Sequence, residues 1–475
     1  MSEHAPNSPH DGIAGPASRI PLPRIRDDTI VARATPRGRG AIGIVRLSGA
    51  EAEAICARVV VPHGGWPVRA RTATRCRVYR ADAPGAILDD GLLTVFPRPA
   101  SYTGETVIEL GLHGGVFVCD SVCASLIAAG ARMAEPGEFT ERAVLHGKLD
   151  LVRAEAIADL IDARSAAGHR QALQQLSGVL TDRFIGLRES ILSLEALLAY
   201  EIDFPEEDDG RLSRVRVAEE ARDVARRIGE LLSTVPAAIL GRDGATVVLA
   251  GAPNAGKSSL FNALLGERRV IVSDTPGTTR DAIEVLLECD PWPIRLVDTA
   301  GLRVSEDAVE REGVATSERL IAQAHIVIAC ADQDDRIAPL VEALCERTAG
   351  RVIGVRTKAD LIMRSRGHHE AWLDVSAVRG DGVHELLARV TREVEAASGV
   401  DPDVPVLTRA RHRLALEKAH NELEQFAKVW WSGALPAPVA AVHVRTAGAA
   451  LDELIGTIDV DAIFARVFST FCVGK

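Results

Sequence analysis

A phosphate-binding loop constrains this chain more than any other feature of its sequence. An apolar run at 246–250 leads into the pattern G-x-x-x-x-G-K-S at 251–258. Glycine at both ends of the pattern lets the backbone approach a phosphate closely, and apolar residues recur at helical spacing directly afterwards. We therefore predict a strand, a loop and a helix in this order. Backbone N–H groups of the loop and the helix N-terminus would hold anionic oxygens.

Two side chains of this loop would act on a bound nucleotide. Lys257 would reach the β and γ phosphates, and the Ser258 hydroxyl would bind magnesium. The alternative is a glycine-rich turn that matches the pattern by accident. The strand-like run before the loop and the helical spacing after it favour the nucleotide site.

Further motifs follow in the order that a guanine-nucleotide domain requires. The sequence Gly-Thr-Thr-Arg-Asp at 277–281 offers a hydroxyl that can join the magnesium shell only when a γ phosphate is present. Asp298 follows a strand-like run at 294–297 and would reach magnesium through water. The Gly301 amide would bind the γ phosphate. This order predicts a switch that senses the γ phosphate.

The last two motifs, at 357–360 and 376–377, form the pocket for the base and identify which base it binds. The Asp360 carboxylate of Thr357-Lys-Ala-Asp can accept hydrogen bonds from N1–H and the amino group of guanine, whereas adenine would leave it unpaired. The sequence therefore indicates GTP rather than ATP. The predicted GTP-binding residues are Asn254, Ala255, Gly256, Lys257, Ser258, Ser259, Ser273, Asp274, Thr275, Pro276, Gly277, Thr278, Thr279, Asp298, Thr299, Ala300, Gly301, Thr357, Lys358, Asp360, Ser376 and Ala377.

The residue that orients the attacking water is not where Ras-like enzymes have it. Leu302 stands at the position of their glutamine and cannot do this, so a polar group must come from elsewhere. The candidates in the following segment are Glu306, Asp307, Glu310 and Glu312. Asn254 could hold a monovalent cation where other enzymes place an arginine finger. Its alternative role is to stabilise the loop as a turn residue.

Length and composition place these motifs in a soluble protein of several domains. A chain of 475 residues is too long for one ordinary core. No apolar run is long enough to span a bilayer, and no secretory signal is evident. The eight cysteines are scattered, which favours reduced thiols over a disulfide framework. We expect a cytoplasmic protein without membrane contact, and its net charge of −11 argues against a broad nucleic-acid surface.

Local composition predicts five segments. Residues 1–26 are poor in large apolar groups and are expected to form a disordered leader. An α+β domain is expected at 27–145 and a helical segment at 146–241. Alternating strand-like and helical runs at 242–398 predict a doubly wound parallel sheet, with the ligand at the carboxyl ends of the strands. A helical pattern returns at 399–475.

The helical segments on both sides of a complete α/β domain suggest that this domain is inserted into a single bundle. An acidic interruption at 202–210 separates two helical stretches of the first segment. We interpret it as a solvated loop.

The chain from about Asp28 to Lys475 resembles the MnmE (TrmE) family of tRNA modification GTPases. Besides the motifs above, the resemblance rests on TPRGRG at 35–40, SYTGE at 101–105, PGEF at 136–139, GKLDL at 147–151, IDFPEE at 202–207 and CVGK at 472–475. It implies an N-terminal folate-binding domain, a helical domain made of two segments, and a Ras-like P-loop GTPase domain inserted in it. This division agrees with the segments predicted from composition.

The resemblance also implies an activity and its partners. With the FAD-containing protein MnmG (GidA), the family adds a carboxymethylaminomethyl or aminomethyl group to C5 of the wobble uridine of certain tRNAs, using a tetrahydrofolate one-carbon unit. It implies a homodimer that joins MnmG in a heterotetramer or larger complex. A folate such as 5-formyltetrahydrofolate would bind at Arg46, Glu109, Lys148 and Lys475. Cys472 would be an essential thiol, with a packed C-terminal cysteine as the alternative.

For the GTPase domain, the resemblance implies potassium-dependent dimerisation of the nucleotide sites. The implied metal ligands are Asn254, Ser273, Thr275 and Thr278 for potassium, and Ser258 and Thr279 for magnesium. Glu310 would position the attacking water. Two positions depart from the family pattern: Thr357 stands where many members have Asn, and His146 replaces the usual Asn before Gly-Lys.

The alternative function is a GTP-switched ribosome- or RNA-assembly factor without modification activity. Its phosphate loop and switch would look the same. The first domain with Arg46, Glu109 and Lys148, and the end at 472–475, favour the modification enzyme, because an assembly switch has no need of them.

Overall fold

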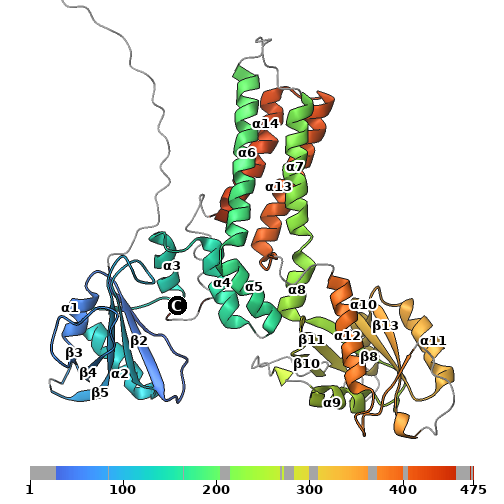
Figure 1. Ribbon diagram of the computed structural model, residues 1–475, viewed down its shortest axis with the longest axis horizontal. Helices are drawn as coiled ribbons and strands as arrows, with labels where there is room; N and C mark the ends of the chain where they lie inside the picture. Colours follow the sequence, from blue (N-terminus) through green and yellow to red (C-terminus); the bar gives the residue numbers. More distant parts are fainter. Residues whose placement is uncertain are drawn as a thin grey trace, which may run out of the picture. The chain divides into compact units, whose positions relative to one another are not determined.

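The structure is a computed structural model, and its contacts divide the chain into two compact units (Figure 1). The first unit comprises Met1–Lys148 with Gly456–Lys475, and the second comprises Leu149–Ile455. The predicted leader lies outside the described residues. The structure describes residues 28–83, 85–163, 165–203, 214–267, 270–271, 283–298, 309–361, 372–398, 405–455, 471 and 474.

The first unit is built on a seven-stranded sheet of order β3-β4-β5-β6-β2-β1-β7. The strands are β1 (Ile30–Arg33), β2 (Ile42–Ser48), β3 (Val60–Pro62), β4 (Thr74–Tyr79), β5 (Ile87–Phe96), β6 (Val107–His113) and β7 (Arg132–Met133). The helices are α1 (Ala52–Ala57), α2 (Val116–Ala128) and α3 (Glu138–Leu145). Only β1 and β7 pair in parallel among these strands; the other pairs are antiparallel. The predicted α+β character of this domain is confirmed.

Strand alternation gives this sheet two different faces. Val45 and Leu47 of β2 join the core formed with α1 and α2. The side chain between them, Arg46, belongs to the opposite face, because successive residues of a strand point to opposite sides. On that face Phe139 of α3 packs with Ile30 of β1. The face away from α1 and α2 therefore carries both a cation and an aromatic ring.

The helical part of the second unit brings together segments that are far apart in the sequence. Its helices are α4 (Leu151–Asp162), α5 (Ala166–Leu176), α6 (Val179–Asp203), α7 (Arg214–Leu232), α8 (Val235–Asp243), α13 (Ala410–Ser432) and α14 (Ala437–Ile455). Helices α6, α7, α13 and α14 lie side by side (Figure 1). They share one core, which includes Phe184, Ile228, Phe426 and Leu451. These helices confirm the helical character predicted on both sides of the α/β domain.

The acidic interruption starts later than predicted. Helix α6 continues through Ile202 and ends at Asp203, so the first two residues of the expected loop are helical. The rest of the stretch, 204–210, lies outside the described residues.

The second unit also contains a seven-stranded sheet of order β14-β13-β12-β8-β11-β10-β9. Its strands are β8 (Ala245–Ala250), β9 (Val270–Ile271), β10 (Ile283–Leu287), β11 (Ile294–Asp298), β12 (Ile326–Ala331), β13 (Arg351–Arg356) and β14 (Trp372–Asp374). Its helices are α9 (Lys257–Glu267), α10 (Val309–Gln323), α11 (Asp334–Cys345) and α12 (Val383–Ser398), with a 3-10 turn at Ala359–Leu361.

This sheet is mixed, which corrects the prediction of an all-parallel one. Strands β8, β11, β12, β13 and β14 are parallel. Strand β10 runs antiparallel to β11, and β9 runs antiparallel to β10. Only a few residues, 288–293, connect β10 to β11, and so short a connection makes a hairpin, whereas parallel neighbours need a long crossover. The strands predicted at 246–250 and 294–297 are confirmed, and they pair in parallel.

Helices cover both faces of the mixed sheet. Val247 of β8 packs on the side of α9 and α12, with Leu260 and Leu386. Its neighbour Val248 packs on the side of α10 and α11, with Ile321 and Leu344. Because both faces are covered, β8 is buried along its whole length. The open positions are thus the loops at the carboxyl ends of the parallel strands.

Two further predictions can be compared with the described part of the chain. Its seven cysteines are all free, and Cys119 and Cys123 are buried as expected for core residues. None of the described helices has the length and apolar composition that crossing a bilayer requires.

Candidate functional site

The phosphate loop has the predicted form, between the end of β8 and the start of α9. Gly251 has φ 150°, and a Cβ there would lie 2.2 Å from the Cys330 carbonyl oxygen. Gly256 has φ 84°, so both positions require glycine. Asn254 has φ 60°, a left-handed conformation that asparagine tolerates better than most residues. Local sequence therefore determines the shape of this loop.

Lys257 and Ser258 face the space that phosphates would fill. The largely buried Lys257 donates from Nζ to the carbonyl oxygens of Gly251, at 3.0 Å, and Ala252, at 2.8 Å. Ser258 Oγ donates to Asp298 Oδ2 across 2.9 Å. A hydroxyl and a carboxylate at this distance are hard oxygen ligands, which fit a magnesium ion beside phosphates. Ser258 and Asp298, which were each predicted to act at the magnesium ion, are thus adjacent in the structure.

The predicted base pocket lies beside this loop. It is lined by Gly256, Ser259, Leu260, Thr357, Lys358, Asp360, Leu361, Val375, Ala377 and Val378. The Ser376 hydroxyl donates to Asp360 Oδ1 at 2.7 Å and accepts from the Arg379 N–H at 3.2 Å. This hydrogen bond from Ser376 lowers the pKa of Asp360. Asp360 is therefore held in place as a carboxylate, the form that can accept two hydrogen bonds from guanine.

The pockets for base and phosphates are continuous. Gly256, Ser259 and Lys358 line both, and Asn254, Lys257 and Ser258 line only the phosphate side. The structure thus brings together the predicted residues of the loop, the base motif and Asp298. The predicted residues that lie outside the described part are Ser273, Asp274, Thr275, Pro276, Gly277, Thr278, Thr279, Thr299, Ala300 and Gly301. Glu310 belongs to α10, but its side chain is not among those described.

A second candidate site lies on the face of the first unit's sheet that points away from α1 and α2. Arg46 of β2 donates from Nε to Glu109 Oε1 of β6 at 2.9 Å, and these residues are direct cross-strand partners. The guanidinium carbon lies 5.9 Å from the Tyr102 ring centre and 5.7 Å from that of Phe139. Arg46 Nη1 also donates to the Gly474 carbonyl oxygen at 3.3 Å. The chain near its last residue therefore lies at the Arg46–Glu109 pair.

The structure describes only one of the other residues that were predicted for this site. Lys148 is exposed, and its Cγ would lie 3.5 Å from a Cβ built on Gly104. Lys148 therefore borders the turn-rich 101–105 loop. Cys472 and Lys475 lie outside the described residues.

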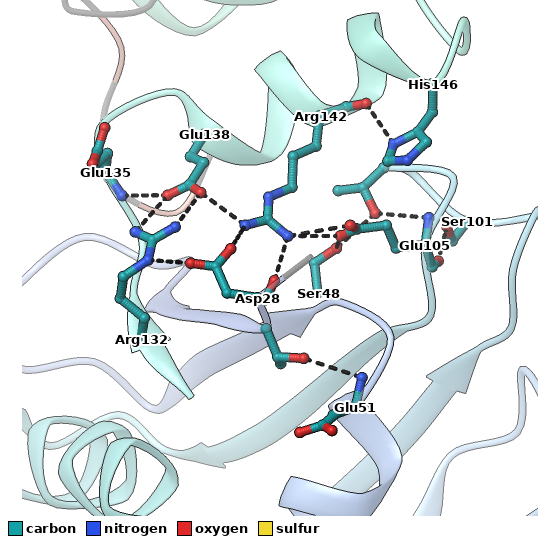
Figure 2. A network of polar contacts seen from close by, with 12 residues as sticks. Asp28, Ser48, Glu51, Ser101, Glu105, Arg132, Glu135, Glu138, Arg142 and His146 are labelled. Atoms are coloured by element: carbon teal, nitrogen blue, oxygen red, sulfur yellow. Dashed lines mark hydrogen bonds and ion pairs between the residues drawn. The ribbon is translucent and has the colours of Figure 1, made fainter. Parts of the chain in front are cut away.

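Figure 2 shows an ionic network that supports two loops of the first unit, at 101–105 and at 135–138. Arg142 of α3 contacts Asp28 at 2.7 Å, Glu138 at 2.9 Å and Glu105 at 3.2 Å. Arg132 joins it through Glu138 and Asp28, each at 2.6 Å. Burial raises the pKa of Glu138, but hydrogen bonds from Arg132 and from a backbone N–H leave it below its ordinary value. The network stays ionised and holds these loops together.

Sequence reasoning missed most of this network. The i, i+4 spacing of Glu138 and Arg142 was a usable signal, because residues at this spacing face each other on a helix. No local signal connects Asp28 with Arg142, since they are 114 positions apart.

Comparisons with known proteins cover nearly the whole chain. The family model described as "GTP-binding protein TrmE N-terminus" matches residues 29–148, and the model "MnmE helical domain" matches residues 151–472. The tRNA modification GTPase MnmE of Azoarcus sp. (strain BH72) is 40% identical over 97% of this chain and 100% of its own length. The protein of the same name from Aquifex aeolicus (strain VF5) is 38% identical over 94% of this chain and 100% of its own length.

Proposed function

Because the chain belongs to the MnmE family of tRNA modification GTPases, we propose that it hydrolyses GTP to modify C5 of the wobble uridine of certain tRNAs. The observation that carries this proposal is the continuity of the two pockets. One guanine nucleotide can have its base at Asp360 and its phosphates at Lys257 and the Ser258–Asp298 pair. Asp360 would select guanine, and the lysine and magnesium would stabilise the charge of the transferring phosphoryl group.

Mass spectrometry of wobble uridines in tRNA from cells lacking this protein tests the proposal. We expect the carboxymethylaminomethyl or aminomethyl group to be missing, and a gene copy encoding the intact chain to restore it. Unchanged wobble uridines would favour the alternative, an RNA-assembly factor.

Within this function, we propose that the GTPase domain is inserted between two segments of one helical domain. The shared core of α6, α7, α13 and α14 supports it, because β8 to β14 lie between α7 and α13 in the sequence. The boundaries that we propose are 27–145, 146–241, 242–398 and 399–475.

We also propose partners. The protein would act in the cytoplasm as a homodimer, together with the FAD-containing MnmG in a heterotetramer or larger complex. Light scattering of the purified chain, alone and mixed with that partner, tests both assemblies. A mass that equals one chain in both samples would contradict them.

We expect GTP turnover to be at least about tenfold faster in potassium than in sodium buffer, because a fixed cation beside the phosphates stabilises negative charge in the transition state. The motive is Asn254, which is one of the residues that line the phosphate pocket. Ser273, Thr275 and Thr278 are the other proposed ligands. Asn254→Gly is the matched variant: glycine adopts the φ of 60° without strain but has no side-chain oxygen. Equal rates of the intact chain in both buffers would exclude a potassium site.

Glu310→Ala is expected to lower kcat by roughly a hundredfold while GTP affinity changes little, because this carboxylate would orient the attacking water. The prediction is motivated by Leu302, which stands at the position of the water-orienting glutamine of Ras-like enzymes and cannot replace it. Glu318→Ala, on the exposed part of the same helix α10, is the control and should retain wild-type turnover. Normal hydrolysis by Glu310→Ala would transfer the role to Glu306, Asp307 or Glu312.

We propose a reduced-folate site at Arg46, Glu109, Lys148 and Lys475, with Cys472 as the essential thiol beside it. The hydrogen bond between Arg46 and the Gly474 carbonyl supports this, because it brings the neighbour of Lys475 to the Arg46–Glu109 pair. A cation suits the carboxylates of a folate. Arg46 itself lies against two aromatic rings, so its replacement would also disturb packing.

Lys148→Ala and Lys475→Ala are therefore the informative variants. Calorimetric titration with 5-formyltetrahydrofolate should show about tenfold weaker binding for each, the effect of losing one charge-assisted hydrogen bond. GTP affinity should be unchanged, since these residues are not part of the nucleotide site. If Lys475→Ala binds the folate as tightly as the intact chain, Lys475 is not in the site.

A further inference from the structure

We infer that this chain recognises guanine without a hydrogen bond to N7 of the base, because Thr357 commits its hydroxyl proton to the phosphate loop. The inference rests on the proposed GTP-binding function and specifies which atoms of the base are recognised. It concerns Thr357, a position at which the resemblance described above implies asparagine in many members of the family.

The hydroxyl of Thr357 is enclosed by the protein's own backbone. Its Oγ1 lies 2.6 Å from the Ala255 carbonyl oxygen and 3.2 Å from the Ala331 carbonyl oxygen. The residue is only 3% exposed. A Cβ built on Gly256 would lie 3.2 Å from Thr357 Cβ, so the side chain packs directly against the loop. A hydroxyl has one proton, and here two carbonyl oxygens already compete for it.

The chemistry of guanine decides whether the Thr357 hydroxyl can bond to the base. N7 and O6 of guanine are both acceptors, so a group that recognises N7 must donate. With its proton committed to Ala255, Thr357 presents only lone pairs, which cannot bond to N7. An asparagine amide carries two N–H groups and a carbonyl, so it can bond to the loop and to the base together. The threonine keeps the loop contact and loses the base contact.

The other side-chain donors among the described residues of the pocket do not replace it. Lys358 has φ 55°, and its Nζ lies 3.3 Å from Asp332 Oδ2, so its ammonium is directed to that carboxylate. Ser259 is exposed in the first turn of α9, on the part of the wall shared with the phosphate pocket. Among the side chains of the pocket, recognition of the base therefore depends on Asp360, which accepts from the N1–H and amino group of guanine.

The test uses three diphosphates that differ by single features of the base. GDP, 7-deaza-GDP and inosine diphosphate displace a fluorescent guanine nucleotide from the full-length protein. We expect 7-deaza-GDP to bind within about twofold of GDP. Inosine diphosphate, which lacks the amino group read by Asp360, should bind about fivefold or more weakly, the effect of one lost hydrogen bond.

Variants of Thr357 test whether the missing bond to N7 is due to the threonine hydroxyl. Thr357→Asn should favour GDP over 7-deaza-GDP by about fivefold, since it restores a donor. Thr357→Val removes the hydroxyl at nearly constant shape. It should weaken both nucleotides equally, because only the contact with Ala255 is lost. Ser259→Ala should show the same ratio of affinities as the intact chain.

Two results would separate the failure of this inference from failure of the proposed function. If the intact chain binds 7-deaza-GDP fivefold or more weakly than GDP, a donor reaches N7 and the inference is wrong. If inosine diphosphate binds as tightly as GDP, Asp360 does not recognise guanine and the GTP assignment itself fails. The measurement on the intact chain is decisive even if Thr357→Asn does not fold.

Discussion

Replacing Lys257 with alanine is expected to lower kcat/KM for GTP by at least about a thousandfold. This loss is larger than the one caused by removing a single neutral hydrogen-bond donor from a site that stabilises a transition state. The reason is its position. Nζ lies within 3.0 Å of two carbonyl oxygens of the phosphate loop, at the first residue of α9. A cation in this largely buried place acts on the phosphates with little screening by water. Steady-state measurement of phosphate release gives the ratio directly.

Lys418→Ala is the control for this prediction. Lys418 is an exposed lysine of α13, so its removal should leave turnover and the circular dichroism spectrum unchanged. A loss of less than tenfold in a folded Lys257→Ala variant would contradict the role assigned to this lysine.

The largest effect on stability is expected at Glu155, a buried carboxylate of α4. It lies 2.8 Å from His412 Nε2 and 3.1 Å from Arg411 Nη2, at the start of α13. Glu155→Ala leaves both groups without their anion. Removing one partner of a buried ion pair costs roughly 3–5 kcal/mol. In a unit of this size that lowers the melting temperature by at least about 6 °C, followed by circular dichroism of the helices.

A matched surface pair provides the control. Glu417 and Arg413, also on α13, form an ion pair in which both side chains are more than 40% exposed. Exposed pairs contribute less than about 1 kcal/mol, so Glu417→Ala should change the melting temperature little. Equal effects of Glu155→Ala and Glu417→Ala would show that the buried cluster does not stabilise the fold.

The same carboxylate makes stability depend on pH. Burial raises the pKa of Glu155, but the hydrogen bond from His412 and the charges of His412 and Arg411 bring it down to about 2. Because this value lies below the ordinary 4.5, the carboxylate stabilises the fold above pH 4.5. Its contribution is lost as the pH falls from 4.5 to about 2. Unfolding of Glu155→Gln should therefore show a weaker dependence on pH in this range.

The nucleotide site could be predicted where its signals are local. Gly251, Gly256 and Lys257 belong to one strand, loop and helix, and each glycine has a backbone requirement that other residues meet poorly. Asp298 and Asp360 could be identified because they stand at or just after strands. Parallel strands place such residues at one edge of a sheet. This is why Ser258 and Asp298, 40 positions apart and each predicted to act at the magnesium ion, lie next to each other.

The remaining features depend on contacts that only the folded chain creates. Glu155 and His412 are 257 positions apart, and a charged residue in a helix is expected at the surface by default. Asp28 and Arg142 were missed for the same reason. The sequence also marked Thr357 as a departure from its relatives, but its effect required the position of the Ala255 carbonyl. Strand β10 was missed although the segment that connects it to β11 contains Asp290-Pro291, a pair that favours a turn.

The shared core of α6, α7, α13 and α14 has a consequence for synthesis on the ribosome. When α7 leaves the ribosome, the apolar faces of α6 and α7 lack the partners that α13 and α14 supply. About 220 further residues, from the end of α7 at Leu232 to the end of α14 at Ile455, must be translated first, which takes roughly 11–45 s at ordinary elongation rates. During this interval Phe184 and Ile228 are without the packing of Phe426 and Leu451. The nascent bundle therefore exposes apolar surface of the kind that chaperones bind, until α13 and α14 have left the ribosome.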